Sequence, residues 1–161
     1  MAIWQVPIEF IPYSWAEENS FNTELLYDED GYDCTPAWEN CQPSKEYRRI
    51  FSSILPQADS WDEELELWGE SPVHDIRVWR ENGLIECMGF RLDLREDIRD
   101  LVKQFIEAAN ELNCYLFIPG LKVICKPDFV ALIQYIRQSN AAKFVSDPHG
   151  YLSEINKKHN K

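Results

Sequence analysis

The clearest pattern of apolar and polar positions lies between residues 75 and 113. Asn82-Gly83 separates two apolar-rich runs, and this dipeptide is typical of a two-residue hairpin turn because both central residues of that turn need a positive φ. After Asp93 the apolar positions change from alternation to the spacing of a helix. The stretch therefore predicts strand, turn, strand and helix in succession. The predicted helical stripe consists of Ile98, Leu101, Val102, Phe105, Ala109 and Leu112.

Shorter patterns predict the remaining elements. Residues 3–11 alternate as a strand does, and we expect an edge strand because Pro7 has no backbone N–H to give to a second neighbour. Asp147-Pro148 combines an N-cap with a proline in the first turn, so a last helix is predicted to follow. The other predicted elements are helices that begin at Ser44 and Asp128 and strands at 65–68, 114–118 and 121–125.

The segment from Pro12 to Pro43 shows no regular period, yet it holds many aromatic side chains among its acids. It is longer than an ordinary connection between two elements. It also has too many aromatic residues for a disordered segment. We expect it to form an ordered layer wrapped over the surface of the protein.

Together these patterns predict a single α+β domain over residues 1–161, in which a mainly antiparallel sheet carries its helices largely on one face. Residues 1–75 form an acidic, aromatic-rich half. Residues 76–161 supply the hairpin, a helix, further strands and another helix. Hydrophobic residues make up 45% of the chain, which is enough for a core without cross-links.

The sequence also bears on the compartment. It has no apolar run long enough to cross a membrane, and its first residues, MAIWQVPIEFIP, lack the basic region of a signal peptide. The five cysteines are odd in number and irregularly spaced, which favours reduced, mostly buried thiols over a disulfide framework. We therefore expect a cytoplasmic protein.

The net charge of −12 is concentrated in one half of the chain. Residues 1–75 hold 17 Asp and Glu against Lys45, Arg48 and Arg49, whereas residues 76–161 are close to neutral. A field of this sign repels nucleic acid and anionic lipid and speeds the encounter with a basic protein. The alternative, in which the charge only keeps the protein in solution, stays open.

Tryptophans interrupt the acidic stretches of this first half. An aromatic side chain among acids either holds its own loop in place or anchors an interface with another protein. A surface that attracts a basic partner would combine such an anchor with exposed carboxylates. The candidate partner-binding residues are Asp28, Glu29, Asp30, Asp33, Trp38, Trp61, Asp62, Glu63 and Glu64.

Two arrangements that suggest a metal fail on spacing. The acidic stretch at 28–33 invites comparison with a calcium loop, but with Gly31 in the glycine position the first and last ligand positions fall on Leu26 and Ala37. Cys34 and Cys41 with three scattered histidines do not have a zinc spacing. We expect no metal and no other cofactor.

A polar stripe beside the hairpin is the candidate for chemistry. Counting outward from the turn, Val78 faces Cys87 and His74 faces Arg91, so His74, Asp75, Arg91 and Asp93 come together. Such a group could move protons or hold an anion, although a ladder of salt bridges ending in a helix cap explains it as well. A small enzyme or ligand-binding domain built on these four residues is the alternative function. Common nucleotide, hydrolase and metalloprotease motifs are missing from the sequence.

The strings LWGE, HDIRVW, RLDLRE and NAAKFVSDP, between about residues 60 and 150, resemble those of small, stand-alone, mostly uncharacterised bacterial proteins. Some proteins of that group are immunity or immunity-like partners of secreted toxins. The resemblance implies the fold more than the function, and it assigns no binding residue. With the charge, it leads us to expect an acidic binding protein, not an enzyme, that neutralises a basic toxin enzyme such as a nuclease. The sequence does not indicate an oligomeric state.

Overall fold

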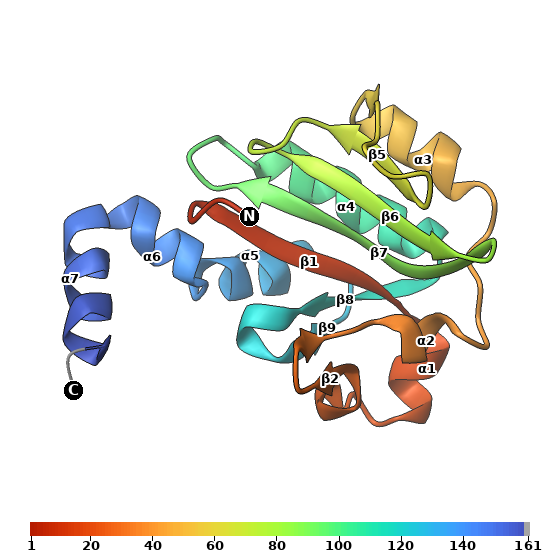
Figure 1. Cartoon of the computed structure of the whole chain (residues 1–161), viewed down its shortest axis with the longest axis horizontal. Coiled ribbons are helices and arrows are strands. Elements are labelled where there is room, and N and C mark those ends of the chain that lie inside the picture. Colours follow the sequence, from red (N-terminus) through yellow and green to blue (C-terminus); the bar gives the residue numbers. More distant parts are fainter. Residues whose placement is uncertain (160–161) are drawn as a thin grey trace.

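Seven strands form one antiparallel sheet in the order β4–β5–β6–β7–β1–β8–β9 (Figure 1). The computed structural model describes the backbone of residues 1–159 and the side chains of residues 1–158. The fold is the predicted α+β class. The strands are β1 (Gln5–Pro12), β4 (Gln57–Ala58), β5 (Leu65–Gly69), β6 (Asp75–Glu81), β7 (Leu84–Asp93), β8 (Cys114–Ile118) and β9 (Val123–Cys125), with a separate ribbon of β2 (Tyr27–Asp28) and β3 (Gly31–Tyr32).

The longer helices lie on one face of this sheet, as predicted. α3 (Tyr47–Ile54) and α4 (Arg99–Glu111) lie behind the sheet in Figure 1, and α5 (Phe129–Arg137) packs beside α4. The ring of Phe105 on α4 stacks on Phe90 of β7 with centroids 3.8 Å apart, and Phe51 of α3 stacks on Phe10 of β1 at 5.5 Å. Alternate residues of β1 and β7 therefore form the core with the helices.

Residues 13–43 cover part of the opposite face, over β1 and β8. The segment is ordered by aromatic contacts, as predicted: Phe21 stacks on Tyr115, and Tyr32 meets Phe117 edge-on. Its secondary structure comes in pieces too short to leave a sequence pattern. These pieces are α1 (Tyr13–Glu18), the 3-10 turn η1 (Thr23–Leu26), the β2–β3 ribbon and α2 (Thr35–Trp38).

The chain ends in a pair of helices. A 3-10 turn, η2 (Pro119–Leu121), joins β8 to β9, and α5 leads into α6 (Asn140–Ser146) and α7 (Pro148–His159). α7 begins at Pro148, where the sequence predicted a helix, and it extends beyond the end of the sheet (Figure 1).

β1 is a central strand, so the prediction of an edge strand is wrong. It pairs with β7 along residues 5–9 and with β8 along residues 9–12. Pro7 faces Arg91 of β7, and β8 does not reach as far as Pro7 on the other side. The missing backbone N–H is tolerated because the two neighbouring strands are staggered along β1.

The β6–β7 hairpin has the predicted turn but not the predicted register. Asn82 and Gly83 have φ of 53° and 80°, and Glu81 faces Leu84. Between Trp79 and Arg80 the register shifts. The extra residue on β7 is Glu86, which forms a β-bulge.

The bulge aligns the apolar faces of the two strands. Beyond it Val78 faces Met88 instead of Cys87, and both Val78 and Met88 are fully buried. A strand pair with one buried face favours the register that places apolar side chains together. The same shift places Asp75, not His74, opposite Arg91, which corrects the predicted pairing of His74.

Candidate protein-binding surface

The first acidic stretch lies on the β2–β3 ribbon and the turn after it. Asp28, Glu29, Asp30 and Asp33 are all exposed. Asp28 Oδ1 accepts a hydrogen bond from the backbone N of Asp30 at 2.8 Å, and Asp33 Oδ1 accepts one from the backbone N of Thr35 at 2.9 Å. These local bonds fix the backbone, so the carboxylates are held at the surface on an ordered turn.

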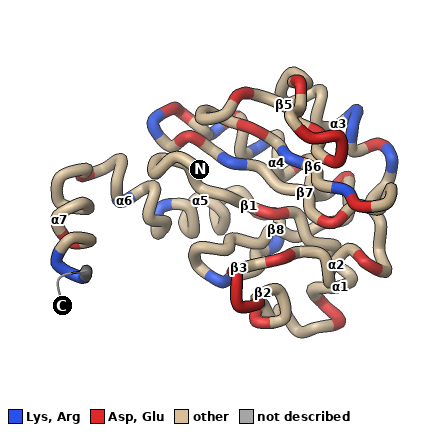
Figure 2. The backbone as a smooth tube through the Cα atoms, viewed as in Figure 1, with Lys and Arg blue, Asp and Glu red and all other residues tan. Residues whose placement is uncertain are grey.

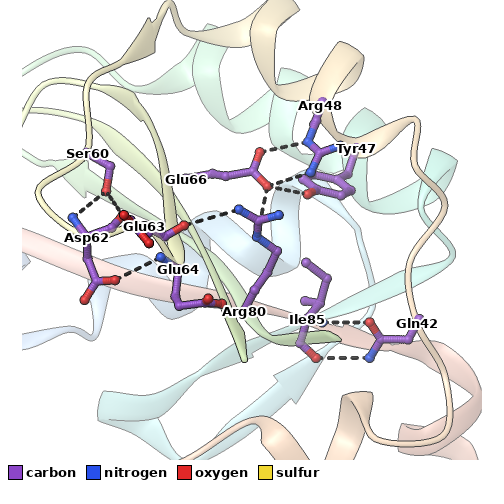
Figure 3. Close-up of polar contacts among 10 residues, drawn as sticks. All are labelled: Gln42, Tyr47, Arg48, Ser60, Asp62, Glu63, Glu64, Glu66, Arg80 and Ile85. Atoms are coloured by element: carbon purple, nitrogen blue, oxygen red, sulfur yellow. Dashed lines mark hydrogen bonds and ion pairs between the residues drawn. The ribbon is translucent and has the colours of Figure 1, made fainter. Parts of the chain in front are cut away.

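The second acidic stretch is the loop before β5, residues 59–64, and Figure 3 shows how it is held. Ser60 donates its hydroxyl proton to the carbonyl of Asp62 at 2.8 Å, and Asp62 Oδ1 accepts from the backbone N of Glu64 at 2.9 Å. The backbone N of Arg80 donates to the carbonyl of Glu64 at 2.8 Å. The side chains of Asp62, Glu63 and Glu64 remain exposed.

Trp61 stands at the surface of this loop, with 65% of its area exposed. The guanidinium of Arg77 lies 5.2 Å from the centre of its ring, and the ring meets Trp79 edge-on at 6.5 Å. Contacts with a cation and with a second indole restrict the rotamers of an exposed indole, so it loses little conformational freedom on binding. Trp61 therefore has the surroundings expected of an interface anchor.

The hairpin bulge at Glu86 lies between the two acidic stretches. The carboxyl of Glu86 pairs with that of Glu81, and one acid from each stretch, Asp33 and Glu64, is near enough for its charge to act on Glu86. The bond to Glu81, partial burial and these neighbouring charges raise the pKa of Glu86 to about 7. Figure 2 shows acidic segments at the β2–β3 ribbon and beside β5. We call this set, residues 28–33, 61–64, Glu81 and Glu86, the acidic surface.

Basic side chains near the acidic surface neutralise a different acid. Glu66 on β5 accepts from Arg48 Nε at 2.9 Å and from the hydroxyl of Tyr47 at 2.6 Å, and Arg80 Nε lies 3.4 Å from it (Figure 3). Within the part of the chain that the structure describes, no ion pair involves an acid of the acidic surface. Its carboxylates are therefore available to an external cation.

Trp38 does not belong to this surface, which corrects its selection as a partner-binding residue. It is 1% exposed and packs in the core from α2. The side-chain amide of Gln42 donates to the carbonyl of Trp38 at 2.8 Å. The same amide donates to the carbonyl of Ile85 at 3.0 Å, and the side-chain oxygen of Gln42 accepts from the backbone N of Ile85 at 2.7 Å (Figure 3). The aromatic ring fills the space between α2 and the sheet, so it holds the segment to the fold.

The polar stripe forms an ion-pair ladder across the sheet. Asp75 is 2% exposed, and its two oxygens accept from Arg91 Nε at 2.9 Å and from Arg77 Nε at 3.2 Å, with a further contact from Arg91 Nη2. A buried carboxylate is stabilised by such charged hydrogen bonds. Both of its oxygens are occupied by internal partners.

The other half of the stripe is equally engaged. His74 Nδ1 accepts from the backbone N of Asp93 at 2.9 Å, and burial lowers the pKa of His74. Asp93 is fully buried and accepts from Arg95 Nε at Oδ1 and from Arg95 Nη2 at Oδ2. The guanidinium of Arg95 lies 3.8 Å from the ring centre of Trp4. These contacts match the salt bridges of the alternative considered for the stripe, but its helix cap is wrong: α4 begins at Arg99, with Ile98 and not Asp93 as N-cap. His74 and Asp93 are joined through a backbone bond rather than through their side chains.

The described residues offer no group of three or more His, Cys, Asp or Glu side chains placed to hold a metal ion. None of the helices in residues 1–159 combines the length and the apolar character that a membrane crossing requires. Comparisons with protein-family models, curated proteins and solved structures found no match to this chain.

Proposed function

We propose that this protein binds a basic protein partner through the acidic surface, with Trp61 as the anchor. The observation that carries the proposal is that both acidic stretches are ordered and exposed, and that none of their carboxylates makes an ion pair among the residues that the structure describes. Like charges held together oppose the folded state. A gathering of this kind is better explained by a cation supplied from outside than by the needs of the fold.

The partner class that we favour is a toxin enzyme such as a nuclease, neutralised in the cytoplasm. A nuclease binds phosphates with basic side chains, so its active site is positively charged. A protein with an acidic surface can cover that site and exclude the nucleic acid. The resemblance to immunity-like bacterial proteins supports the same role.

The acidic surface and the anchor would act at different stages of binding. Charge complementarity raises the rate of encounter, and the effect weakens as salt screens the charges. A buried aromatic anchor mainly slows dissociation. The two contributions can therefore be separated by kinetics.

The test reverses four acids that make no hydrogen bond holding the backbone: Glu29→Lys, Asp30→Lys, Glu63→Lys and Glu64→Lys. The wild-type protein is used to capture its partner from the source cell at low salt, and association is then measured with the isolated partner. We expect the reversal to slow association by about tenfold or more and to flatten its salt dependence. The melting temperature should hardly change because exposed charges contribute little to stability.

The matched control applies the same charge change elsewhere: Glu18→Lys, Glu96→Lys, Glu107→Lys and Glu154→Lys, all exposed. This control should associate nearly as fast as the wild type. Trp61→Ala should leave the association rate unchanged and raise the dissociation rate by about thirtyfold, the effect of a strong anchor. If the reversal and the control behave alike, the acids only keep the protein in solution and the proposal fails.

A further inference from the structure

The last helix leaves the body of the protein. Figure 1 shows α7 standing away from the sheet, and its main packing partner is α6, where Tyr151 meets Phe144 with ring centroids 6.0 Å apart. α7 has 12 residues. An isolated helix of this length is only marginally stable in water, so helices of this kind depend on packing. α7 therefore lacks much of the contact that a stable helix requires.

One side of α7 is apolar. Leu152 and Ile155, three residues apart, share this side, and Tyr151 lies at its edge, where it packs on Phe144. Leu152 is 44% exposed. Past this stripe come Lys157 and Lys158, both exposed and without an ion pair among the residues that the structure describes. The helix thus offers an apolar stripe followed by two positive charges.

The same chain has a largely apolar groove next to an acidic turn. A cavity of about 620 Å³ opens at the end of the sheet, between the N-terminal residues, the β8–β9 turn and α6, and most of its lining is apolar. Met1, Ile3 and Tyr32 line it and are 76%, 39% and 40% exposed. One wall is the β2–β3 ribbon, whose turn carries Glu29 and Asp30. The groove is therefore mostly apolar inside, with Lys143 also in its lining, and the acidic turn lies next to the ribbon residues that form this wall.

We propose that α7 docks into this groove of a second copy of the chain, while the second copy's α7 docks in the same way into the first. The apolar stripe would fill the groove, and Lys157 and Lys158 would lie against the acidic turn at 28–30. Each chain has both the helix and the groove, so a two-fold symmetric dimer would form the helix–groove contact twice. An exchange of this kind removes exposed apolar surface from water at both sites.

The geometry favours a second copy over the helix's own groove. Only Asp147 separates α6 from α7, and Tyr151 already forms part of the groove wall. To enter its own groove, α7 would have to turn about Asp147 and lose the contact between Tyr151 and Phe144. A helix arriving from another molecule is not tied to the groove through Asp147, so it can dock while its own Tyr151 stays packed on Phe144. The Trp61 loop lies beside β5, at the far end of the molecule from α7 (Figure 1). The turn at 28–30 belongs to the acidic surface as well, so dimerisation is separated from partner binding by Leu152→Asp, which leaves that turn unchanged.

The first experiment measures the mass of the full-length protein by sedimentation over a range of concentrations. We expect the wild type to dimerise and Leu152→Asp to be monomeric with an unchanged melting temperature. The matched control is Val130→Asp, which places the same charge on an aliphatic position of α5 that is 62% exposed and lies outside the groove. The control should dimerise like the wild type. A wild type that stays monomeric at every concentration overturns the proposal, and so does a dimer that survives Leu152→Asp.

A charge exchange tests which surfaces meet. Lys157→Glu with Lys158→Glu should raise the dissociation constant of the dimer by about tenfold, the effect of losing two surface ion pairs. Adding Glu29→Lys and Asp30→Lys to the same chain should restore most of the affinity, because the two charges are then exchanged across the contact. If the fourfold variant associates no better than the double variant, α7 does not meet the acidic turn and the proposed arrangement is wrong.

Discussion

The environment of Glu9 depends on residues that are distant from it in the sequence. It lies on the outer face of β1, directly over Gly89 of β7, where a Cβ would collide with its carboxylate. The hydroxyl of Tyr32 donates to Glu9 Oε1 at 3.2 Å. Burial raises the pKa of Glu9 to about 7, although the bond from Tyr32 and the charge of Arg77 act in the opposite direction. The alternation of β1 places Glu9 on the polar face, but it does not show that another segment covers it.

This burial predicts a pH dependence of stability. Because its folded pKa lies above the unfolded value of 4.5, Glu9 binds more proton in the folded state between pH 4.5 and about 7. The free energy of unfolding should therefore fall as the pH rises through this window and level off above it. The glutamine side chain of Glu9→Gln cannot titrate. The fall in the free energy of unfolding between about pH 5 and about pH 8, measured by urea unfolding, should therefore be smaller in this variant by about 2 kcal/mol.

The matched control for this measurement is Glu17→Gln. Glu17 Oε1 accepts from the hydroxyl of Tyr115 at 2.7 Å, which is the same kind of bond on an exposed side chain. A change of the pH profile in Glu17→Gln equal to that in Glu9→Gln would assign the effect to the tyrosine bond. The burial of Glu9 would then not be its cause.

Among the elements, the contact between α4 and the sheet holds the largest part of the predicted core. Four residues of the predicted stripe are buried, and Ile98 and Leu101 are half-buried against the core. The buried residues are Val102, Phe105, Ala109 and Leu112. Phe105 lies parallel to Phe90 with an interplanar angle of 2°. The hairpin and the helix were predicted as neighbours because they follow one another in the chain. Their packing brings together the elements whose sequence patterns are strongest.

Phe105→Ala should therefore be strongly destabilising. Phe105 is fully buried, and emptying such a site costs both the lost transfer energy and the remaining cavity. We expect a loss of ~3–5 kcal/mol in chemical denaturation. Val130→Ala, at a position 62% exposed on α5, is the comparison and should change stability by less than about 0.5 kcal/mol. A loss from Phe105→Ala as small as that would contradict the assigned helix face.

At the scale of the whole molecule, the five cysteines report on the arrangement of distant parts of the chain. All are free, and they come from the α2 start, the loop after it, and strands β7, β8 and β9. Cys34, Cys114 and Cys125 are buried, whereas Cys41 is exposed. Burial raises the pKa of the Cys114 thiol, which lowers the fraction of the reactive thiolate further.

A thiol reagent added without reductant should thus modify Cys41 first in the native protein. Cys34, Cys114 and Cys125 should react only after unfolding, when all five thiols become available. Mass spectrometry of digested samples locates the modified residues, and Cys41→Ser is the control that removes the fast phase. A bonded pair in the native protein, or rapid labelling of Cys114, would contradict the arrangement.

The sequence by itself determined the elements that carry a long, regular pattern. The turn at Asn82-Gly83, the helix before Asn113 and the helix capped by Asp128 appear where their periodicity and capping residues place them. These features depend on which side of one element faces the core, and that information is local. α6 is too short to show a clear period, although Ser139 caps it by accepting a hydrogen bond from the backbone N of Ala142.

Only the tertiary structure decided which parts of the chain became neighbours. It made β1 central, buried Trp38 and, through the bulge at Glu86, moved Asp75 opposite Arg91. It also brought one acid from each acidic stretch, Asp33 and Glu64, near Glu86. Such neighbours result from the packing of distant segments, in which the burial of apolar faces outweighs local preference. A pattern along the chain does not record that outcome, so the acidic surface exists only in the folded protein.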